Sequence, residues 1–245
     1  MYERLVLVWM ALAVAVWILL SQVTAPYGRH VRQGWGTPLN ARMAWMVMEL
    51  PSLLIPLYGL LWGRPEGLAA FFLGLWVFHY AYRSLLFPFL IRARKDVPFS
   101  VVGMALVFNL ANSGFNTYSL LFVKDYASSW TSDPRFLLGV CLFLSGFVMH
   151  VVSDARLRAL RREGEGSYRI PQGWLFRWVS CPNYFGEILE WTGWALATWS
   201  LAGISFALWT CANLVPRALS HHRWYRQHFP DYPADRKALI PVIGP

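Results

Sequence analysis

Ionisable side chains inside otherwise apolar stretches are the first candidates for chemistry in this sequence. Glu49 lies in such a stretch two residues before Pro51, whose ring removes a helical hydrogen bond and can open the backbone locally. A charged group inside a membrane is costly, so such a residue predicts a functional site unless a partner neutralises it. Two interpretations stay open, because Glu49 is either a general acid or a carboxylate neutralised by Arg42 or Arg83.

A second group consists of His79, Tyr80 and Arg83, whose spacings of three and four residues place them on one flank of a helix. A phenol beside a protonated carboxyl group can form a proton-donating pair, since burial favours the neutral acid that general acid catalysis requires. Tyr80 is also open to interpretation as an aromatic residue at the membrane interface.

Three asparagines draw a stripe of amides along one side of an apolar segment. Asn109, Asn112 and Asn116 are three and four residues apart, so they share one helical face. Such a stripe either joins neighbouring helices by hydrogen bonds or lines a polar cavity. The sequence does not decide between these alternatives.

The most polar part of the chain is its C-terminal third, where three helical faces carry charged or hydrogen-bonding groups. They consist of Asp154, Arg158 and Arg161, of Asn183, Glu187 and Glu190, and of Arg217, His221 and Tyr225. Guanidinium groups match phosphate oxygens, while carboxylates and amides suit ribose hydroxyls or a carboxamide. The faces predict either a nucleotide pocket at the cytoplasmic mouth or salt bridges between loops.

Several common chemistries are missing from the sequence. Neither Gly34-Trp-Gly36 nor Gly164-Glu-Gly166 continues into a dinucleotide fingerprint, and there is no Walker loop or nucleophile elbow, so a nucleotide must be held in a non-Rossmann way. The three cysteines and the histidines lack the spacing of metal ligands. We therefore expect no metal site and no disulfide framework.

Long apolar helices must position these groups. Of the 245 residues 56% are hydrophobic and 14% are charged, against roughly 25% charged in an ordinary soluble domain. A helix of roughly 20 apolar residues crosses a bilayer. Seven stretches qualify, at about residues 5–23, 43–62, 67–91, 98–123, 135–155, 184–200 and 201–219. We expect an all-α membrane protein with seven transmembrane helices in a single domain, residues 1–245.

Basic residues alternate between the loops on the two sides of these helices. Of the 22 basic residues, 17 fall on one side and four on the other, while Arg83 lies within a span. Cytoplasmic loops are enriched in Lys and Arg, so the C-terminus is expected in the cytoplasm and the N-terminus outside. The net charge is +9, and the basic residues lie between apolar stretches. A nucleic-acid binder instead gathers them on one polar face. The preference for Arg over Lys favours a GC-rich, bacterial genome.

At these positions the sequence resembles the steroid 5α-reductase family, the 3-oxo-5α-steroid 4-dehydrogenases, and especially their type 2 members. The resemblance covers most of the chain and rests on Glu49-Leu-Pro-Ser52, His79-Tyr80 with Arg83, Ser153-Asp154, Ser167 to Gly173, Asn183 with Gly186-Glu187, Glu190-Trp191, Ala195 to Ser200, His221-His-Arg223 with Tyr225, Asp231-Tyr-Pro233 and Arg236 to Pro241. A weaker likeness, centred on Pro182-Asn183-Tyr184, extends to sterol reductases and isoprenylcysteine methyltransferases.

The resemblance implies an enzyme that holds NADPH and reduces the C4–C5 double bond of a 3-oxo-Δ4 steroid to a 5α-dihydro product. Glu49 and Tyr80 would be catalytic and would polarise the C3 carbonyl while hydride reaches C5. Arg83, Asn112 and Asn116 would also bind the substrate, chiefly within about residues 1–125. The cofactor would be bound within about residues 126–245 by Asp154, Arg161, Tyr168, Arg169, Asn183, Glu187, Arg217, His221 and Tyr225.

Three positions depart from the pattern of the type 2 members. This chain has Met48 in place of Gln, Met104 in place of Arg and His150 in place of Asn. The changes put the shape of the substrate in question and leave the cofactor pocket largely intact.

Other functions are compatible with parts of the pattern. They are a membrane methyltransferase that uses S-adenosylmethionine, a reductase of another lipid enone or sterol, and a small channel or transporter. Polar residues gathered at one membrane face, rather than along a continuous path, argue against a channel.

The expected partners follow from the membrane assignment. They are a steroid entering from the bilayer and the membrane lipids, with no nucleic acid and no obligate protein partner. The expected location is a bacterial inner membrane, or the endoplasmic reticulum if the source is eukaryotic.

Overall fold

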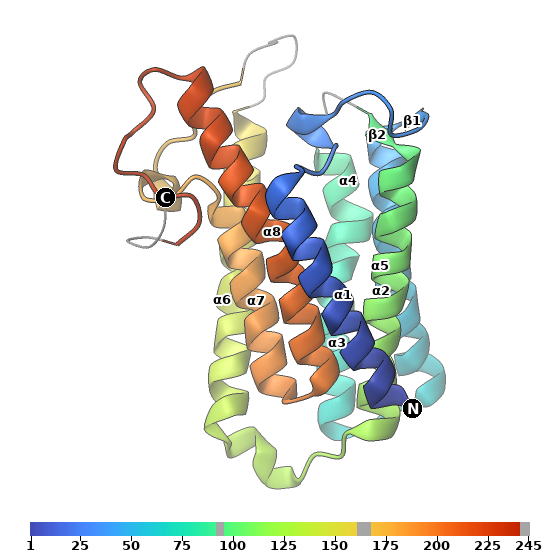
Figure 1. Cartoon of the computed structure of the whole chain (residues 1–245). Coiled ribbons are helices and arrows are strands. Elements are labelled where there is room, and N and C mark those ends of the chain that lie inside the picture. The colour runs from blue at the N-terminus through green and yellow to red at the C-terminus, as the bar shows by residue number, and fades with distance from the viewer. Residues whose placement is uncertain (92–95, 161–167, 241–245) are drawn as a thin grey trace. The chain divides into compact units, whose positions relative to one another are not determined.

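The computed structural model describes residues 1–91, 96–160 and 168–240 of the chain, and it is built from helices (Figure 1). The long helices are α1 (Tyr2–Gln22), α2 (Ala41–Gly63), α3 (Gly67–Ala81), α5 (Phe99–Tyr118), α6 (Pro134–Ala159), α7 (Pro182–Thr198) and α8 (Leu201–His228). A π-helical turn, η2 (Tyr82–Leu86), joins α3 to α4 (Phe87–Leu90), and a second one, η3 (Ser119–Val123), continues α5. The shorter elements are the 3-10 helices η1 (Gly28–His30), η4 (Ser128–Ser132) and η5 (Trp174–Arg177), and the antiparallel strands β1 (Pro38–Leu39) and β2 (Val97–Pro98).

Each of the seven stretches expected to be helical contains one of these helical segments, which confirms the predominantly helical fold. Among the described residues, four segments are long and apolar enough, by length and composition alone, to cross a membrane: Tyr2–Gln22, Ala41–Gly63, Gly67–Leu90 and Pro134–Ala159. The last helix, α8, runs to His228 and therefore continues beyond the expected end at residue 219. The seven spans and the sides on which the termini lie stay predictions.

The chain forms two compact units. One consists of Met1–Thr24, Pro134–Trp199 and Ile204–Pro245, and we call it the α6–α8 unit. The other consists of Ala25–Asp133 and Ser200–Gly203, and we call it the α2–α5 unit. The N-terminal helix α1 thus belongs to the same unit as the C-terminal helices. The expected division into a substrate part and a cofactor part near residue 125 stays a prediction.

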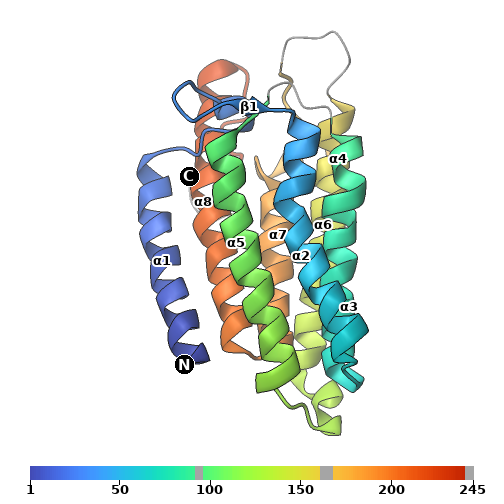
Figure 2. The same cartoon turned by 90° about the vertical axis from the view of Figure 1, so that its right-hand side faces the viewer.

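In the α2–α5 unit, α2 lies beside α3 and α5 (Figure 2), and a side chain of α3 compensates for Pro56 in α2. Pro56 has no N–H to donate to the carbonyl of Ser52 four residues earlier. The indole Nε1 of Trp76, on α3, donates to this carbonyl over 2.8 Å. From α5, the Asn109 amide donates to the carbonyl of Met48 over 2.7 Å. The carbonyl that Pro56 leaves without its helical donor therefore binds α3, and a second carbonyl of α2 binds α5.

In the α6–α8 unit, glycines allow α6 and α7 to pack backbone against backbone. A Cβ atom on Gly186 of α7 would lie 2.6 Å from the backbone nitrogen of His150, and one on Gly139 of α6 would lie 2.5 Å from that of Ala197. Small residues permit this close approach of membrane helices. It aligns the polar faces of α6 and α7.

The N-terminal helix packs along α8 in the same unit (Figure 1). The Trp209 indole donates to the carbonyl of Trp9 over 3.1 Å, and the two ring centroids are 4.7 Å apart. Near the other end of α1, the hydroxyls of Thr24 and Ser220 are 3.0 Å apart. The two ends of the sequence are thus held together inside one unit.

Candidate functional site

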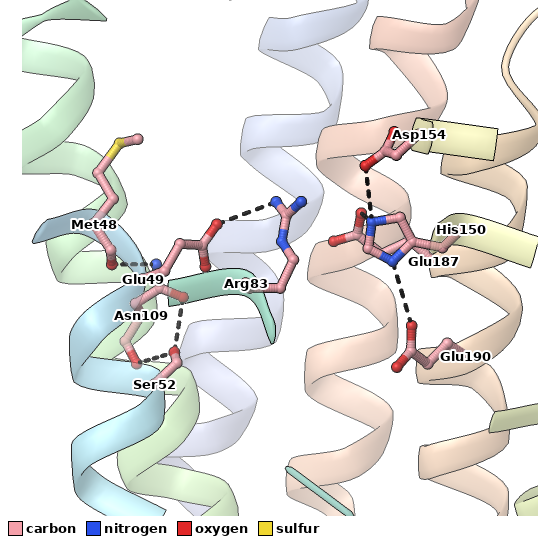
Figure 3. A network of polar contacts seen from close by, with 9 residues as sticks. All are labelled: Met48, Glu49, Ser52, Arg83, Asn109, His150, Asp154, Glu187 and Glu190. Atoms are coloured by element: carbon pink, nitrogen blue, oxygen red, sulfur yellow. Dashed lines mark hydrogen bonds and ion pairs between the residues drawn. The ribbon is translucent and has the colours of Figure 1, made fainter. Parts of the chain in front are cut away.

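The α2–α5 unit contains a buried ion pair between Glu49 of α2 and Arg83 of η2 (Figure 3). The Nη2 atom of Arg83 donates to Oε1 of Glu49 over 3.2 Å. The two residues are 9% and 8% exposed. Of the two arginines that the sequence offered as partners, the structure selects Arg83, while the guanidinium of Arg42 lies over the ring of Phe89 at 5.5 Å.

Local sequence explains how Arg83 reaches this position. Pro88 cannot donate to the carbonyl of Ser84, and the helix widens at this place into the π-helical turn of Tyr82–Leu86. Such turns in α-helices are frequent at functional sites. The Arg83 guanidinium also lies over the rings of Trp45 and Phe87, at 5.0 and 4.7 Å. A carboxylate and two aromatic faces thus compensate for the burial of one cation.

Tyr80 lies three residues before Arg83 in the same helical segment and is 4% exposed. Its ring stacks on that of Trp76, with centroids 5.4 Å apart, and meets the ring of His79 edge to face at 4.8 Å. Its packing leaves little freedom for the phenol to move. A fixed phenol near a buried charge is suited to act as a preorganised donor.

The amide stripe of α5 contains contacts that join segments. Asn109, besides its bond to Met48, accepts a hydrogen bond from the Ser52 hydroxyl over 2.9 Å. The Asn116 amide donates to the carbonyls of Asn112 and Ala202, and the Asn112 amide donates to Phe108 within the helix. These contacts support the first alternative for the stripe, the joining of segments. A substrate contact by Asn112 or Asn116 stays a prediction.

The α6–α8 unit contains a second polar cluster, centred on the imidazole of His150 (Figure 3). Nε2 lies 3.3 Å from Asp154 Oδ2 and 3.9 Å from Glu187 Oε2, while Nδ1 lies 3.8 Å from Glu190 Oε2. The amide of Asn183 donates to Asp154 Oδ1 over 3.0 Å. Three expected cofactor residues, Asp154, Asn183 and Glu187, thus gather around one histidine.

A third cluster is centred on Tyr184, which directly follows Asn183 on α7. The Nε atom of Arg217 donates to the hydroxyl of Tyr184 over 3.1 Å, and this hydroxyl is 3.1 Å from Nε2 of His221. The rings of Tyr184 and His221 are stacked, with centroids 5.7 Å apart. Arg217 and His221 are 7% and 8% exposed. The buried guanidinium of Arg217 offers hydrogen-bond donors to a polar ligand. The carboxylates of the cluster around His150 offer acceptors.

Two further expected cofactor residues pack against aromatic rings. Tyr225 stacks on Tyr232 at 5.3 Å, and the ring of Tyr168 meets that of Trp224 edge to face at 5.0 Å. Arg169 is exposed. Arg161 lies outside the described residues.

Sequence reasoning did not assign His150 or Tyr184 to a site, and it placed Glu190 on a polar helical face without naming it as a cofactor residue. His150 entered only as a departure from a family pattern, although its spacing of four residues from Asp154 was a usable signal. Tyr184 and Glu190 lay within quoted motifs. Their roles depend on contacts between helices, which residue spacing in one helix does not supply.

Fold and clusters together define a helical membrane protein that keeps charged groups buried in both of its units. The profile of the family described as 3-oxo-5-alpha-steroid 4-dehydrogenase matches residues 95–243. The chain is 45% identical over 239 residues to 3-oxo-5-alpha-steroid 4-dehydrogenase 1 of Bos taurus, covering 95% of this chain and 93% of the relative. It is 40% identical over 237 residues to the protein of the same name from Homo sapiens, covering 95% and 92%.

A plant protein shows a similar likeness. Steroid 5-alpha-reductase DET2 of Arabidopsis thaliana is 40% identical over 238 residues, covering 92% of this chain and 90% of the relative. The chain therefore belongs to the 3-oxo-5-alpha-steroid 4-dehydrogenase family, a family of oxidoreductases. The resemblance found in the motifs is confirmed.

Proposed function

We propose that this protein reduces the C4–C5 double bond of 3-oxo-Δ4 steroids with NADPH, to give 5α-dihydro products. The observation that carries the proposal is the buried ion pair between Glu49 of α2 and Arg83, 3.2 Å apart, in a chain of this family. Arg83 lies on the helical segment that also carries Tyr80. Conjugate reduction places negative charge on the C3 oxygen as hydride reaches C5, and a proton then reaches C4 to give the saturated product. Tyr80 and Glu49 polarise this oxygen, and preorganised donors in a dry site stabilise such charge well.

The ion pair sets a condition on the role of Glu49. A carboxylate accepts hydrogen bonds and cannot donate one, so Glu49 must carry a proton whenever it donates to the C3 oxygen. The apolar body of a steroid excludes water, which makes any unpaired charge more costly. Arg83 therefore positions Glu49, and Tyr80 supplies a donor that needs no prior protonation.

NADPH is proposed to bind the α6–α8 unit. Carboxylate and amide groups of Asp154, Asn183 and Glu187 suit ribose hydroxyls or the carboxamide, while Arg217 suits phosphate. The cofactor supplies the hydride when bound. The residues of the chain orient it and exclude water from the transfer.

The cheapest test is a comparison of ligands on the purified protein. NADPH should raise the melting temperature, and incubation with a panel of 3-oxo-Δ4 steroids should give 5α-dihydro products. Stabilisation by S-adenosylmethionine instead of NADPH would contradict the proposal and indicate a methyltransferase. Turnover of a different lipid enone or a sterol, with no steroid product, would correct the substrate.

The proposed setting is a membrane crossed seven times, with the N-terminus outside and the C-terminus in the cytoplasm. It is supported by the seven helical segments and by the division of basic residues between the loops. The membrane is the inner membrane for a bacterial source and the endoplasmic reticulum for a eukaryotic one. Reporter fusions at both ends should place them on opposite sides, and placement on the same side would remove one span.

A further inference from the structure

A buried polar cluster lies where the end of the chain meets the segment before α7. Ser180, His222 and Tyr232 are 3%, 3% and 7% exposed, and none of them belongs to the proposed cofactor set. They come from the loop before α7, from α8 and from the C-terminal segment. We call these three residues the C-terminal latch.

The Ser180 hydroxyl is the centre of the latch. Its Oγ atom lies 2.7 Å from Nδ1 of His222 and 2.6 Å from the hydroxyl of Tyr232. It also lies 3.1 Å from the carbonyl of Lys237. A hydroxyl has one proton to donate and two lone pairs to accept with. The three partners therefore use its one proton and both of its lone pairs. Loss of the hydroxyl would remove a hydrogen-bond partner from buried polar groups of α8 and of the C-terminal segment.

The geometry argues against a nucleophilic serine. A serine and a histidine within hydrogen-bond reach are the start of a catalytic pair. Here the hydroxyl is held from three sides and buried, so a substrate carbon would have to replace Tyr232 or Lys237 to reach it. The arrangement suits a device that holds segments together.

Backbone contacts show which segments the latch joins. The backbone nitrogen of Ser180 donates to the carbonyl of Lys237 over 2.8 Å, and that of Lys237 donates to Trp178 over 2.9 Å. The Cys181 nitrogen donates to Ala238 over 3.1 Å. The C-terminal segment thus runs beside residues 178–181 and fixes their backbone conformation just before α7 begins.

The latch residues lie next to proposed cofactor residues in the sequence, both before α7 and on α8. Asn183 and Tyr184 follow Ser180 within four residues, and His221, which contacts Tyr184, directly precedes His222 on α8. On the other side, Arg236 donates to the carbonyl of Pro171 over 3.2 Å and to the Tyr232 hydroxyl at 3.5 Å. Residues 169–183, which form this loop and the first two residues of α7, are therefore held near both ends.

We propose that Ser180, His222 and Tyr232 are positioning residues, which hold the loop of residues 169–183 in the conformation that binds NADPH. The proposal rests on the NADPH site proposed above. Loss of the latch lowers the affinity for the cofactor because the loop must then be ordered by the cofactor itself, at a cost in conformational entropy. The chemical step, which uses Glu49 and Tyr80, is left unchanged once NADPH is bound.

The test compares Ser180→Ala and Tyr232→Phe with the wild type. We expect the Kd and KM for NADPH to rise about tenfold in each variant, as loss of one well-made buried hydrogen bond implies. The kcat at saturating NADPH and the KM for the steroid should change less than about twofold on the same grounds. Ser180→Thr, which keeps the hydroxyl, should restore most of the affinity.

Thr210→Val is the matched control. Its hydroxyl is also buried in the α6–α8 unit, but it donates to the carbonyl of Phe206 within α8, over 2.9 Å. Its removal should leave the Kd for NADPH unchanged. An equal loss in this variant would mean that any buried hydroxyl has the effect, and it would overturn the proposal.

Hydrogen exchange of the protein without cofactor separates this proposal from the proposed function. Ser180→Ala and Tyr232→Phe should lose protection in residues 168–183, whether or not NADPH is the ligand. Unchanged protection and unchanged NADPH affinity would overturn the latch. A wild type that binds no NADPH would overturn the cofactor assignment instead, while exchange would still decide whether the latch holds the loop.

Discussion

Replacing Glu49 by glutamine tests whether this residue takes part in chemistry or only neutralises Arg83. The substitution keeps the size of the side chain and its ability to hydrogen-bond, and it removes the negative charge 3.2 Å from the guanidinium. Both residues are less than a tenth exposed. Arg83 would then remain as a buried cation without its carboxylate.

The structure limits the expected loss of stability. Breaking a buried ion pair by removing one partner costs about 3–5 kcal/mol. The guanidinium keeps the rings of Trp45 and Phe87 at 5.0 and 4.7 Å, and the glutamine oxygen can still accept from it. We therefore expect the free energy of unfolding to fall by about 2–3 kcal/mol, which lowers the melting temperature by roughly 5–10 °C in a protein of this size.

The double variant Glu49→Gln with Arg83→Gln separates stability from catalysis. With both charges gone, most of the lost stability should return, because no unpaired cation remains. Turnover of a 3-oxo-Δ4 steroid at saturating NADPH should stay at least about a hundredfold below wild type in both variants, because an amide can donate a hydrogen bond but cannot transfer a proton as a carboxyl group can. Arg83→Gln alone, which retains the carboxyl group, should keep more turnover than either.

The reasoning is refuted if stability and turnover recover together in the double variant. Glu49 would then be a structural partner of Arg83, and the proposed site would be wrong. The Kd for NADPH should be the same in all four proteins and serves as the control for folding of the α6–α8 unit.

Four further predictions address single groups. Tyr80→Phe should lower kcat about a hundredfold to a thousandfold with unchanged NADPH affinity; a wild-type rate would remove Tyr80 from the site. Arg217→Ala should weaken NADPH binding about tenfold or more in a titration, with little change in the KM for the steroid; equal losses for both ligands would contradict a phosphate contact. Gly186→Ala should lower the melting temperature sharply, because its Cβ would lie 2.6 Å from a backbone nitrogen of α6, whereas Gly114→Ala, with nothing within 4 Å, should not. For His222, which lies beyond the expected span, burial and the nearby cations Arg226, Lys237 and Arg236 lower the pKa below 6.5. Its contribution to stability is therefore complete above pH 6.5 and is lost as the pH falls through the lowered pKa. The melting temperature should fall less on acidification in His222→Asn than in the wild type, and an equal fall in both proteins would refute the assignment.

The helices of this protein were largely predictable because their cause is local. The stretch at residues 43–62 became Ala41–Gly63, and the stretch at 98–123 became α5 with its π-helical continuation. The break between the stretches at 184–200 and 201–219 was also expected. It forms because the left-handed Trp199 ends α7 and the Ser200 hydroxyl then accepts a hydrogen bond from the backbone nitrogen of Gly203 over 3.0 Å. Apolar length and turn chemistry decide such features within a few residues of sequence.

The clusters of expected site residues were predictable only by type. Spacing placed Asn183 and Glu187 on one face of a helix, and the guanidinium of Arg217 suggested an anionic ligand. Residue spacing could not show that Asp154 and His150 of α6 lie against that face of α7. Their position depends on glycines that bring α6 and α7 into backbone contact. Met48 and His150 differ from the type 2 pattern, and the likeness to type 2 members stays a prediction.

By itself, the sequence determined the apolar helices, the buried polar residues that cost energy inside them, and the motifs that mark the family. It left open whether Arg42 or Arg83 meets Glu49, and whether the amides of α5 join helices. The tertiary structure decided both, since Pro88 is accompanied by a widened turn at Arg83 and Asn109 bonds to α2. Only the folded chain also brings Ser180 to Tyr232, 52 residues apart. Contacts between distant segments depend on packing geometry, which no local pattern of residues encodes.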